Sequence, residues 1–436
     1  MGGFVDGYDL LILSAALLLL IPHFHLDAAR VGILVASAYL GSFFGAMIFG
    51  YYTDLRGRRG IFILDLALFI VFSIISGLSP NYTVLLISRF LLGVAIGMDF
   101  PTAGAMIAEF APAHARGRLL SVWQLLWAVG ALIAPLVAIT LLPLGPDAWR
   151  WMLASGAVPA AIVLVGRRFV PETPRWLMSQ GKIAEAHTVL AWAGRTERHA
   201  GTAVPQHDAA APETRLAEQT RFGEMFNSRY RRLTIIISLV CFAGAFGPLF
   251  LSSYTAFLAK YYGFSSNLRA LEFGTIIWFF YIVGNVINFL LTDRVGRKPM
   301  LIGGAILVTV TLLIASRTSI SNITLVFAVL IFAAIGHWGG VDQGLWQYSA
   351  EVFPTRIRGT ARGFTTSWIR LSAFLSALLT PTLLKRLGFS STMLLFAGIE
   401  VIVIVLAFAL PEVKGRALED IAKEGRETAP ASSYTT

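Results

Sequence analysis

Seven ionisable side chains interrupt stretches of this sequence that are otherwise apolar, and these residues could do chemistry. They are Asp6, Asp9, Arg89, Asp99, Asp342, Arg370 and Glu400. A charge at the centre of a bilayer costs roughly 2.5–3.5 kcal/mol even on a mild insertion scale, so such residues usually mark functional sites. A buried carboxylate can carry a proton, and a guanidinium can bind a carboxylate through two parallel hydrogen bonds. The pattern therefore predicts proton and anion chemistry at membrane depth.

Arg370 is the deepest of these charges. It stands in 365-TTSWIRLSAFLSALL-379, and Arg358 opens the same apolar span. On a helix, Arg370 would lie ~18 Å beyond Arg358, close to the bilayer midplane. Snorkelling covers only a few ångströms, so the charge must face protein or water. We expect Arg370 to bind the anionic group of a substrate. The alternative is a structural ion pair with Asp342 or Asp99.

The elements that position these residues are long apolar segments. Of the 436 residues, 56% are hydrophobic and 14% are charged, whereas ordinary soluble domains carry ~25% charged residues. Apolar runs of about 20 residues, each able to cross a ~30 Å hydrocarbon layer, recur along the chain. We expect twelve spans, near 4–24, 29–52, 61–79, 83–110, 119–142, 149–169, 233–261, 267–292, 299–316, 322–352, 361–384 and 390–410. The first is interpreted as a span, not a signal peptide, because no basic segment precedes it.

The basic residues behind the net charge of +10 are unevenly placed. They gather in alternate loops: Arg56, Arg58 and Arg59; Arg116 and Arg118; Arg167, Arg168 and Arg175; Arg294, Arg297 and Lys298; Arg356, Arg358 and Arg362. The positive-inside rule places these loops, and both termini, on the cytoplasmic side of the cell membrane. The charge thus follows topology, and we expect no nucleic-acid partner. The single cysteine, Cys241, excludes an internal disulfide and shows no metal-ligand spacing.

The sequence contains an internal duplication. The segment 108-AEFAPAHARGR-118 matches 350-AEVFPTRIRGT-360, 54-DLRGRR-59 matches 293-DRVGRK-298, and 171-PET-173 matches 411-PEV-413. All three pairs are offset by about 240 residues, which indicates two related halves. We expect an all-α integral membrane protein with six-helix bundles over 1–170 and 232–412. Residues 171–231 would form a cytoplasmic linker with short helices, and 413–436 a cytoplasmic tail. Two halves around a shared site are the general plan of secondary transporters.

These motifs resemble the major facilitator superfamily. The segments 50-GYYTDLRGRR-59 and 293-DRVGRK-298 look like its signature loop, and 89-RFLLGVAIG-97 is also similar. The segments 149-WRWM-152, 171-PETPRWL-177 and 411-PEVKG-415 are typical of the branch with sugar porters, organic ion transporters and proton-coupled organic-acid symporters. The resemblance covers nearly the whole chain and implies two pseudo-symmetric six-helix bundles. No HExxH, GxSxG or P-loop motif occurs, so we expect neither an enzyme nor a metal or cofactor.

The signature loops combine acidic and basic residues in both halves. The gating residues we expect are Asp54, Arg58, Glu109, Arg116, Asp293, Arg297, Glu351 and Arg358. Their ion pairs would hold the halves together while the cavity faces outward, and they would break when it opens inward. The alternative is that the arginines only satisfy the positive-inside rule, although topology alone would require only the bases.

The proton-coupling residues we expect are Asp9, Asp99, Arg89 and Asp6. Asp6 and Asp9 share one helical face, and 7-GYD-9 resembles the first span of sugar and phosphate symporters. In those proteins the aspartate carries the proton, and the arginine matching Arg89 lies near it. Asp99, in 97-GMDFP-101, matches an aspartate of phosphate and organic-acid symporters. The alternatives are a static Asp9–Arg89 pair and a packing role for Asp99.

The substrate-binding residues we expect are Arg370, Asp342, Trp346, Gln124 and Asp99. The pattern 358-RGTARGFTTSWIR-370 resembles organic anion transporters and bacterial aromatic-acid symporters, in which this arginine binds the substrate carboxylate. Trp346 and Gln124 match a cavity tryptophan and a substrate-binding glutamine of sugar porters. Asp342 is close to the repeat equivalent of Asp99, so both are expected to face one cavity. For Trp346 and Gln124 the alternative is helix packing.

We therefore expect a proton-coupled symporter of a small organic anion, a monocarboxylate or an aromatic acid. Sugar or polyol symport is an alternative that Gln124 and Trp346 favour, although 244-GAFGPLFLSSYTAFL-258 lacks the paired glutamines of sugar porters. Inorganic phosphate symport and export of a drug or metabolite are further alternatives. The expected partners are the anionic substrate, protons and the lipid bilayer, and we expect the chain to act as a monomer.

Overall fold

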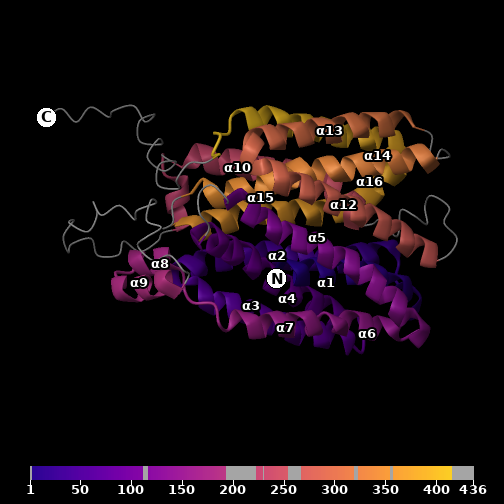
Figure 1. Cartoon of the computed structure of the whole chain (residues 1–436). Coiled ribbons are helices and arrows are strands. Elements are labelled where there is room, and N and C mark those ends of the chain that lie inside the picture. Colours follow the sequence, from indigo (N-terminus) through magenta and orange to yellow (C-terminus); the bar gives the residue numbers. More distant parts are fainter. Residues whose placement is uncertain are drawn as a thin grey trace.

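The computed structural model of the chain describes residues 2–110, 116–192, 222–228, 230–253, 267–318, 323–353 and 357–414. These residues form helices and turns, and no strand occurs among them. Figure 1 shows two bundles side by side, the first coloured indigo to magenta and the second orange to yellow. Met1 and the tail 415–436 lie outside the described residues, as do 193–221 of the linker. The predicted domain boundaries and the cytoplasmic position of the termini therefore stay predictions.

The first bundle contains six helical segments long enough to cross a membrane. They are α1 (Gly2–Phe24), α2 (Ala28–Arg56), α3 (Arg58–Gly77), α4 (Tyr82–Phe110), α5 (Arg116–Leu141) and the pair α6 (Ala148–Ser155) and α7 (Ala157–Arg167). Asp27 caps α2 by accepting a 2.7 Å hydrogen bond from the backbone N–H of Arg30. Short helices α8 (Pro174–Ser179) and α9 (Ile183–Trp192) follow at one end of the bundle (Figure 1).

The second bundle repeats this plan after the turn η5 (Phe222–Phe226). Its helices are α10 (Arg231–Ser253), α12 (Asn267–Val295), α13 (Arg297–Arg317), α14 (Ile323–Gly336), α15 (Asp342–Glu351) and α16 (Arg358–Phe408). The π-helical turn η6 (His337–Val341) joins α14 to α15, and these three form the tenth expected span. Gly388, at φ 77°, divides α16 into the eleventh and twelfth spans. The expected spans coincide with helices, to within a few residues, wherever the structure describes them. Residues 254–261 of the seventh expected span, 233–261, lie outside the described residues.

The duplicated motifs make the same turn in both halves. Gly57 and Gly296 have φ values of 95° and 114°, a region that favours glycine because it has no Cβ. The next helix then begins against a carboxylate: Glu172 accepts the backbone N–H of Arg59 at 3.0 Å, and Glu412 that of Arg297 at 3.1 Å. A carboxylate satisfies the free N–H groups of a helix N-terminus and suits its dipole. The PET and PEV motifs thus fix the start of α3 and α13.

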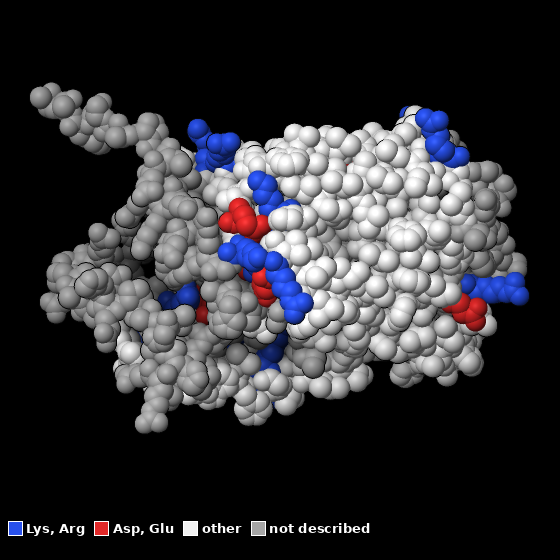
Figure 2. All heavy atoms as spheres, turned by 45° about the horizontal axis from the view of Figure 1, so that its top comes forward, with Lys and Arg blue, Asp and Glu red and all other residues white. Residues whose placement is uncertain are grey.

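The two bundles meet along several helices, of which α16 carries Arg370 and Glu400. Across the interface α2 packs against α16 and α5 packs against α12. On the face shown in Figure 2, the described charged side chains gather toward the two ends, with a broad uncharged band between them. Such a band suits contact with a hydrocarbon layer. The charges within the spans are therefore buried in protein, as their cost in lipid requires.

Candidate substrate and proton sites

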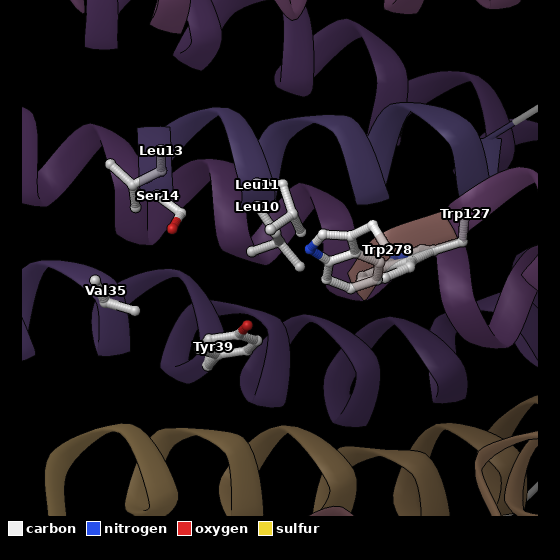
Figure 3. A pocket seen from close by; sticks show the side chains of 8 residues that line it. All are labelled: Leu10, Leu11, Leu13, Ser14, Val35, Tyr39, Trp127 and Trp278. Carbon is white, nitrogen blue, oxygen red and sulfur yellow. The ribbon is translucent and has the colours of Figure 1, made fainter. Parts of the chain in front are cut away.

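A pocket lies between the two halves, about midway along the helices. It is lined by Leu10, Leu11, Leu13, Ser14, Val35, Tyr39, Trp127 and Trp278. Figure 3 shows the rings of Trp127, from α5, and Trp278, from α12, together at one end of the pocket, with the hydroxyls of Ser14 and Tyr39 farther along. A neighbouring hollow shares Ser14 and Trp278 and reaches Leu271, near the start of α12. The space therefore extends toward the end of the helices at which α12 begins.

Two clusters of aromatic rings flank Gln124. On one side, Trp127 lies 5.6 Å from Trp278 and 4.8 Å from Trp338 between ring centroids. On the other side, Phe100 stacks on Trp346 at 4.6 Å and meets Trp123 at 4.8 Å. Gln124, between Trp123 and Trp127 on α5, donates a hydrogen bond to Asp342 of α15. The rings and this bond connect the halves at the depth expected of a substrate site.

Arg370 reaches this region from α16 with a side chain that is only 4% exposed. Its guanidinium carbon lies 3.8 Å from the ring centroid of Phe100 and 5.7 Å from that of Trp346. Among the described residues, no ion pair joins Arg370 to a carboxylate. The carboxylates of Asp342 and Asp6 nevertheless lie near enough to attract this guanidinium, and the alternative of a pair with Asp342 stays a prediction. Aromatic faces attract the cation but do not neutralise it.

Asp9 and Arg89 form a closed ion pair inside the first bundle. Arg89 donates from Nη1 to Oδ1 of Asp9 at 3.0 Å and from Nη2 to Oδ2 at 2.5 Å, and both side chains are 0% exposed. The pair joins α1 to α4. Because both charges are buried, loss of either one would leave the other uncompensated. Protonation of Asp9 would therefore leave the charge of Arg89 without its ionic partner.

Asp6 and Asp99 belong to a second cluster, with two members that we did not predict as site residues. Arg167 of α7 donates two hydrogen bonds of 2.8 Å to Asp65 of α3 and a third to Asp99 of α4. Asp6 lies close enough to feel the charges of Asp99 and Asp65. Among the described residues, Oδ2 of Asp6 and Oδ2 of Asp99 have no hydrogen-bond partner. Arg167 thus binds two buried carboxylates, and Asp6 lies near both of them and near the charges of Arg370 and Arg167.

The prediction that Arg167 is a loop residue is wrong, because its side chain is only 4% exposed inside the bundle. Asp65 could have been found from the sequence, since it interrupts the apolar run 61–79 as the other candidates interrupt theirs. Asp99 and Asp342 do not share one contact: within the described residues, Asp99 is bonded to Arg167 and Asp342 to Gln124.

Most of the expected gating residues meet at one end of the molecule. Arg58 contacts Asp54 at 3.0 Å and Glu109 at 3.1 Å, and Glu109 also contacts Arg358 at 3.2 Å. Asp54 accepts the backbone N–H of Gly359 at 3.1 Å as well as both N–H and Oγ1–H of Thr360. We call Asp54, Arg58, Glu109, Arg358 and Thr360 the latch, because they join α2 and α4 to the start of α16.

The corresponding residues of the second half pair among themselves. Arg297 contacts Asp293 and Glu351, each at 2.9 Å. Arg116 is the first residue of α5, but its side chain lies outside the described part of the structure. Among the described ion pairs, therefore, only that between Glu109 and Arg358 crosses the two halves. The latch lies at the end of the interface at which α12 finishes, opposite the hollow near Leu271.

Replacing Asp54 by asparagine should lower turnover by roughly 10-fold, because a charged hydrogen bond across the latch contributes about 1.5–3 kcal/mol. The variant would shift the balance between the two facing states, while substrate affinity should change less than about 3-fold, since Asp54 lies far from the pocket. Exchange rates in proteoliposomes and calorimetric binding would measure both quantities. Asp147→Asn, at an exposed position, is the control. Lower affinity with unchanged turnover would contradict a gating role.

Glu400 and His337 stand apart from these clusters. Both side chains are 1% exposed, and neither has a hydrogen-bond partner among the described residues. His337 begins the π-helical turn η6, a feature that often occurs at functional sites. The ring of His337 lies 6.3 Å from that of Trp338, which contacts the pocket residue Trp127, whereas no described contact connects Glu400 to the pocket.

The chain is similar to known transporters along nearly its whole length. The model of the family described as "Sugar (and other) transporter" matches residues 1–424. The inner membrane metabolite transport protein YgcS of Escherichia coli is 32% identical over 413 residues, which cover 94% of this chain and 89% of the relative. The glucose transporter GlcP of Staphylococcus epidermidis is 30% identical, with 98% and 96% covered. The major myo-inositol transporter IolT of Bacillus subtilis is 30% identical, with 98% and 92% covered.

A solved structure has the same fold. The proton:xylose symporter XylE bound to 6-bromo-6-deoxy-D-glucose superimposes with a TM-score of 0.85 at 24% sequence identity, and 96% of each chain is covered. This likeness confirms the predicted twelve-helix major facilitator fold.

Proposed function

The chain belongs to the sugar (and other) transporter family, and from this premise we propose that it is a proton-driven symporter of the cell membrane that works by alternating access. The observation that carries the proposal is the buried Asp9–Arg89 ion pair inside the first bundle, in which one carboxylate that can accept a proton is bound to one arginine. The latch would close the cytoplasmic side, and the pocket would open to the outside. The membrane-spanning fold supplies the two halves that must rock about the site.

Proton coupling follows from the chemistry of the pair. A proton that reaches Asp9 from outside removes its charge, so Arg89 loses its ionic partner. Arg89 is then free to make other contacts, which allows α1 and α4 to shift relative to each other. When the proton leaves toward the cytoplasm, the pair forms again and favours the outward-facing state. Asp6 and Asp99, with partnerless oxygens in the second cluster, are further proton acceptors in this scheme.

A sugar or polyol is the first candidate for the substrate. Relatives across nearly the whole chain are named as glucose and myo-inositol transporters. The pocket supports this choice because Tyr39 and Ser14 offer hydroxyls beside the faces of Trp127 and Trp278. Aromatic faces suit the apolar faces of a sugar ring, and polar groups between them fix its orientation. Gln124 would contribute hydrogen bonds once Asp342 releases it.

A small organic anion is the second candidate, and Arg370 favours it. The guanidinium is buried near the midplane and has no ionic partner among the described residues. A neutral sugar would leave this cation with only the more distant carboxylates of Asp342 and Asp6, whereas a substrate carboxylate would pair with its fork. The family comparison supports the first candidate more strongly, and the charge inside the site supports the second.

Uptake into proteoliposomes with an imposed pH gradient would test proton drive. We expect D-glucose, myo-inositol or benzoate to accumulate above its outside concentration when the outside is acidic. A protonophore should remove this accumulation but not exchange of labelled for unlabelled substrate. Accumulation that persists with the protonophore would contradict the proposed coupling, whichever substrate is carried.

A further inference from the structure

Arg362 is a second buried arginine on α16, one helical turn after the latch residue Arg358. The prediction that it lies in a loop is wrong, since its side chain is only 2% exposed. Among the described residues, its Nε and Nη1 atoms have no hydrogen-bond partner. A buried charged group without partners is costly, and within a membrane protein it usually marks a site for something that binds and leaves.

The side chain of Arg362 packs closely against a glycine of the neighbouring helix α4. The guanidinium of Arg362 lies against Gly104 of α4 so closely that a Cβ at this position would overlap its Nη1 atom. Its carbon lies 5.8 Å from the ring centroid of Trp346, and that of Arg370 lies 5.7 Å from the same ring. Arg362 and Arg370 are about two helical turns apart on one face of α16, ~12 Å along the axis. The two cations therefore share one aromatic neighbour at the interface between the halves.

The charges that face Arg362 do not neutralise it. Asp99 of α4 attracts it and Arg358 of α16 repels it, both from a distance, and burial adds to the cost. Asp99 already accepts a hydrogen bond from Arg167. Within the described residues no ion pair involves Arg362. Two buried guanidiniums thus follow each other from the middle of the site toward the latch. Among the described residues neither has a carboxylate within ion-pair distance, although Asp342 and Asp6 attract Arg370 from farther away.

We infer that Arg362 is a second anion-binding residue, which receives the substrate carboxylate after Arg370 on its way to the cytoplasm. The inference rests on the proposed function, of which it develops the anionic candidate. The ring of Trp346 would contact the body of the substrate while the carboxylate passes from one guanidinium to the other. A sugar acid carries a carboxylate on a hydroxylated ring. The carboxylate would bind to the two arginines, and the ring would resemble the substrates of the related sugar transporters.

Matched pairs of acid and neutral compounds would test this inference on the full chain in proteoliposomes. The pairs are D-glucuronate and D-glucose, D-gluconate and D-glucitol, and benzoate and benzyl alcohol. We expect at least one acid to bind roughly 10-fold or more tightly than its neutral partner, as one charged hydrogen-bonding group allows. The variants are Arg362→Met, Arg362→Lys and Gly104→Ala, with the exposed Arg386→Met as the control.

Arg362→Met should lower exchange of that acid roughly 10-fold or more, while its affinity from outside changes less than about 3-fold, because Arg370 still captures it. Arg362→Lys should restore part of the rate. Gly104→Ala keeps the charge of Arg362, but the added methyl group takes the space that the guanidinium occupies. This variant should therefore reproduce the defect. Exchange of a transported neutral compound should not change in Arg362→Met.

Three results would overturn the inference, and they separate its failure from that of the proposed function. Normal acid exchange in Arg362→Met, with loss of acid binding in Arg370→Met, would leave anion symport standing without a role for Arg362. Equal losses for acid and neutral substrates would make Arg362 part of the conformational change alone. Proton-driven uptake of a neutral compound, with no acid bound by the wild type, would remove the anionic candidate and leave sugar or polyol symport intact.

Discussion

Replacement of Asp9 by asparagine should abolish accumulation of substrate against a gradient and leave exchange measurable. The amide has nearly the shape of the carboxylic acid, so the packing of α1 against α4 should survive. It cannot take up or release a proton, so the cycle loses the step that couples substrate movement to the pH gradient. Arg89 is bound to Asp9 through both Nη atoms. In the variant it would face a neutral partner throughout the cycle, whereas in the wild type it does so only while Asp9 is protonated.

The measurement is a pair of assays on the same proteoliposomes, uptake driven by a pH gradient and exchange without one. Asp147→Asn, an exposed carboxylate near the start of α6, is the matched control and should accumulate substrate normally. Asp99→Asn tests the second cluster in the same way. If Asp9→Asn and Asp99→Asn both accumulate substrate like the wild type, neither carboxylate couples transport to protons.

Replacement of Arg370 by alanine should weaken binding of an anionic substrate by about 1.5–3 kcal/mol, or roughly 10- to 150-fold in affinity. The guanidinium lies over Phe100 and near Trp346, where a carboxylate could meet its fork in a site shielded from water. Arg370→Lys keeps the charge but offers only a compact ammonium, so it should recover part of the affinity. A neutral sugar should lose much less affinity in both variants.

Calorimetric titration with an acid and its neutral analogue would measure these differences on variants that elute as folded protein in size-exclusion chromatography. The comparison also separates the two substrate candidates. If folded Arg370→Ala binds a carboxylate as tightly as the wild type, the arginine has a structural role. The cost of its burial would then have to be offset by the rings of Phe100 and Trp346 alone.

The latch and the pocket together define the conformation that these experiments start from. Glu109 and Arg358 join the halves at one end, and Asp54 holds the first residues of α16. At the other end the hollow near Leu271 reaches the pocket. Under the proposed function, these contacts would close the side of the latch, and a ligand would enter from the opposite side.

The sequence alone determined the fold, because its signals are local and repeated. Apolar runs of membrane length can satisfy their backbone groups only as helices, and motifs repeated in both halves identified a duplicated bundle. The resemblance of 7-GYD-9 to the first span of sugar and phosphate symporters implied that Asp9 lies near Arg89. The acidic and basic residues repeated in both signature loops predicted that Asp54 pairs with a nearby arginine.

Only the tertiary structure shows which charged side chains contact one another. Arg167 and Arg362 stand near the ends of apolar runs, where a count of loop charges assigns both to the cytoplasm. Their helices fold so that one guanidinium meets Asp65 and Asp99, whereas the other fills the notch at Gly104. Whether a long side chain points to water or back into the bundle depends on helix rotation and on the residue opposite. That residue lies far away in sequence, so the pattern of a single span contains no signal for it.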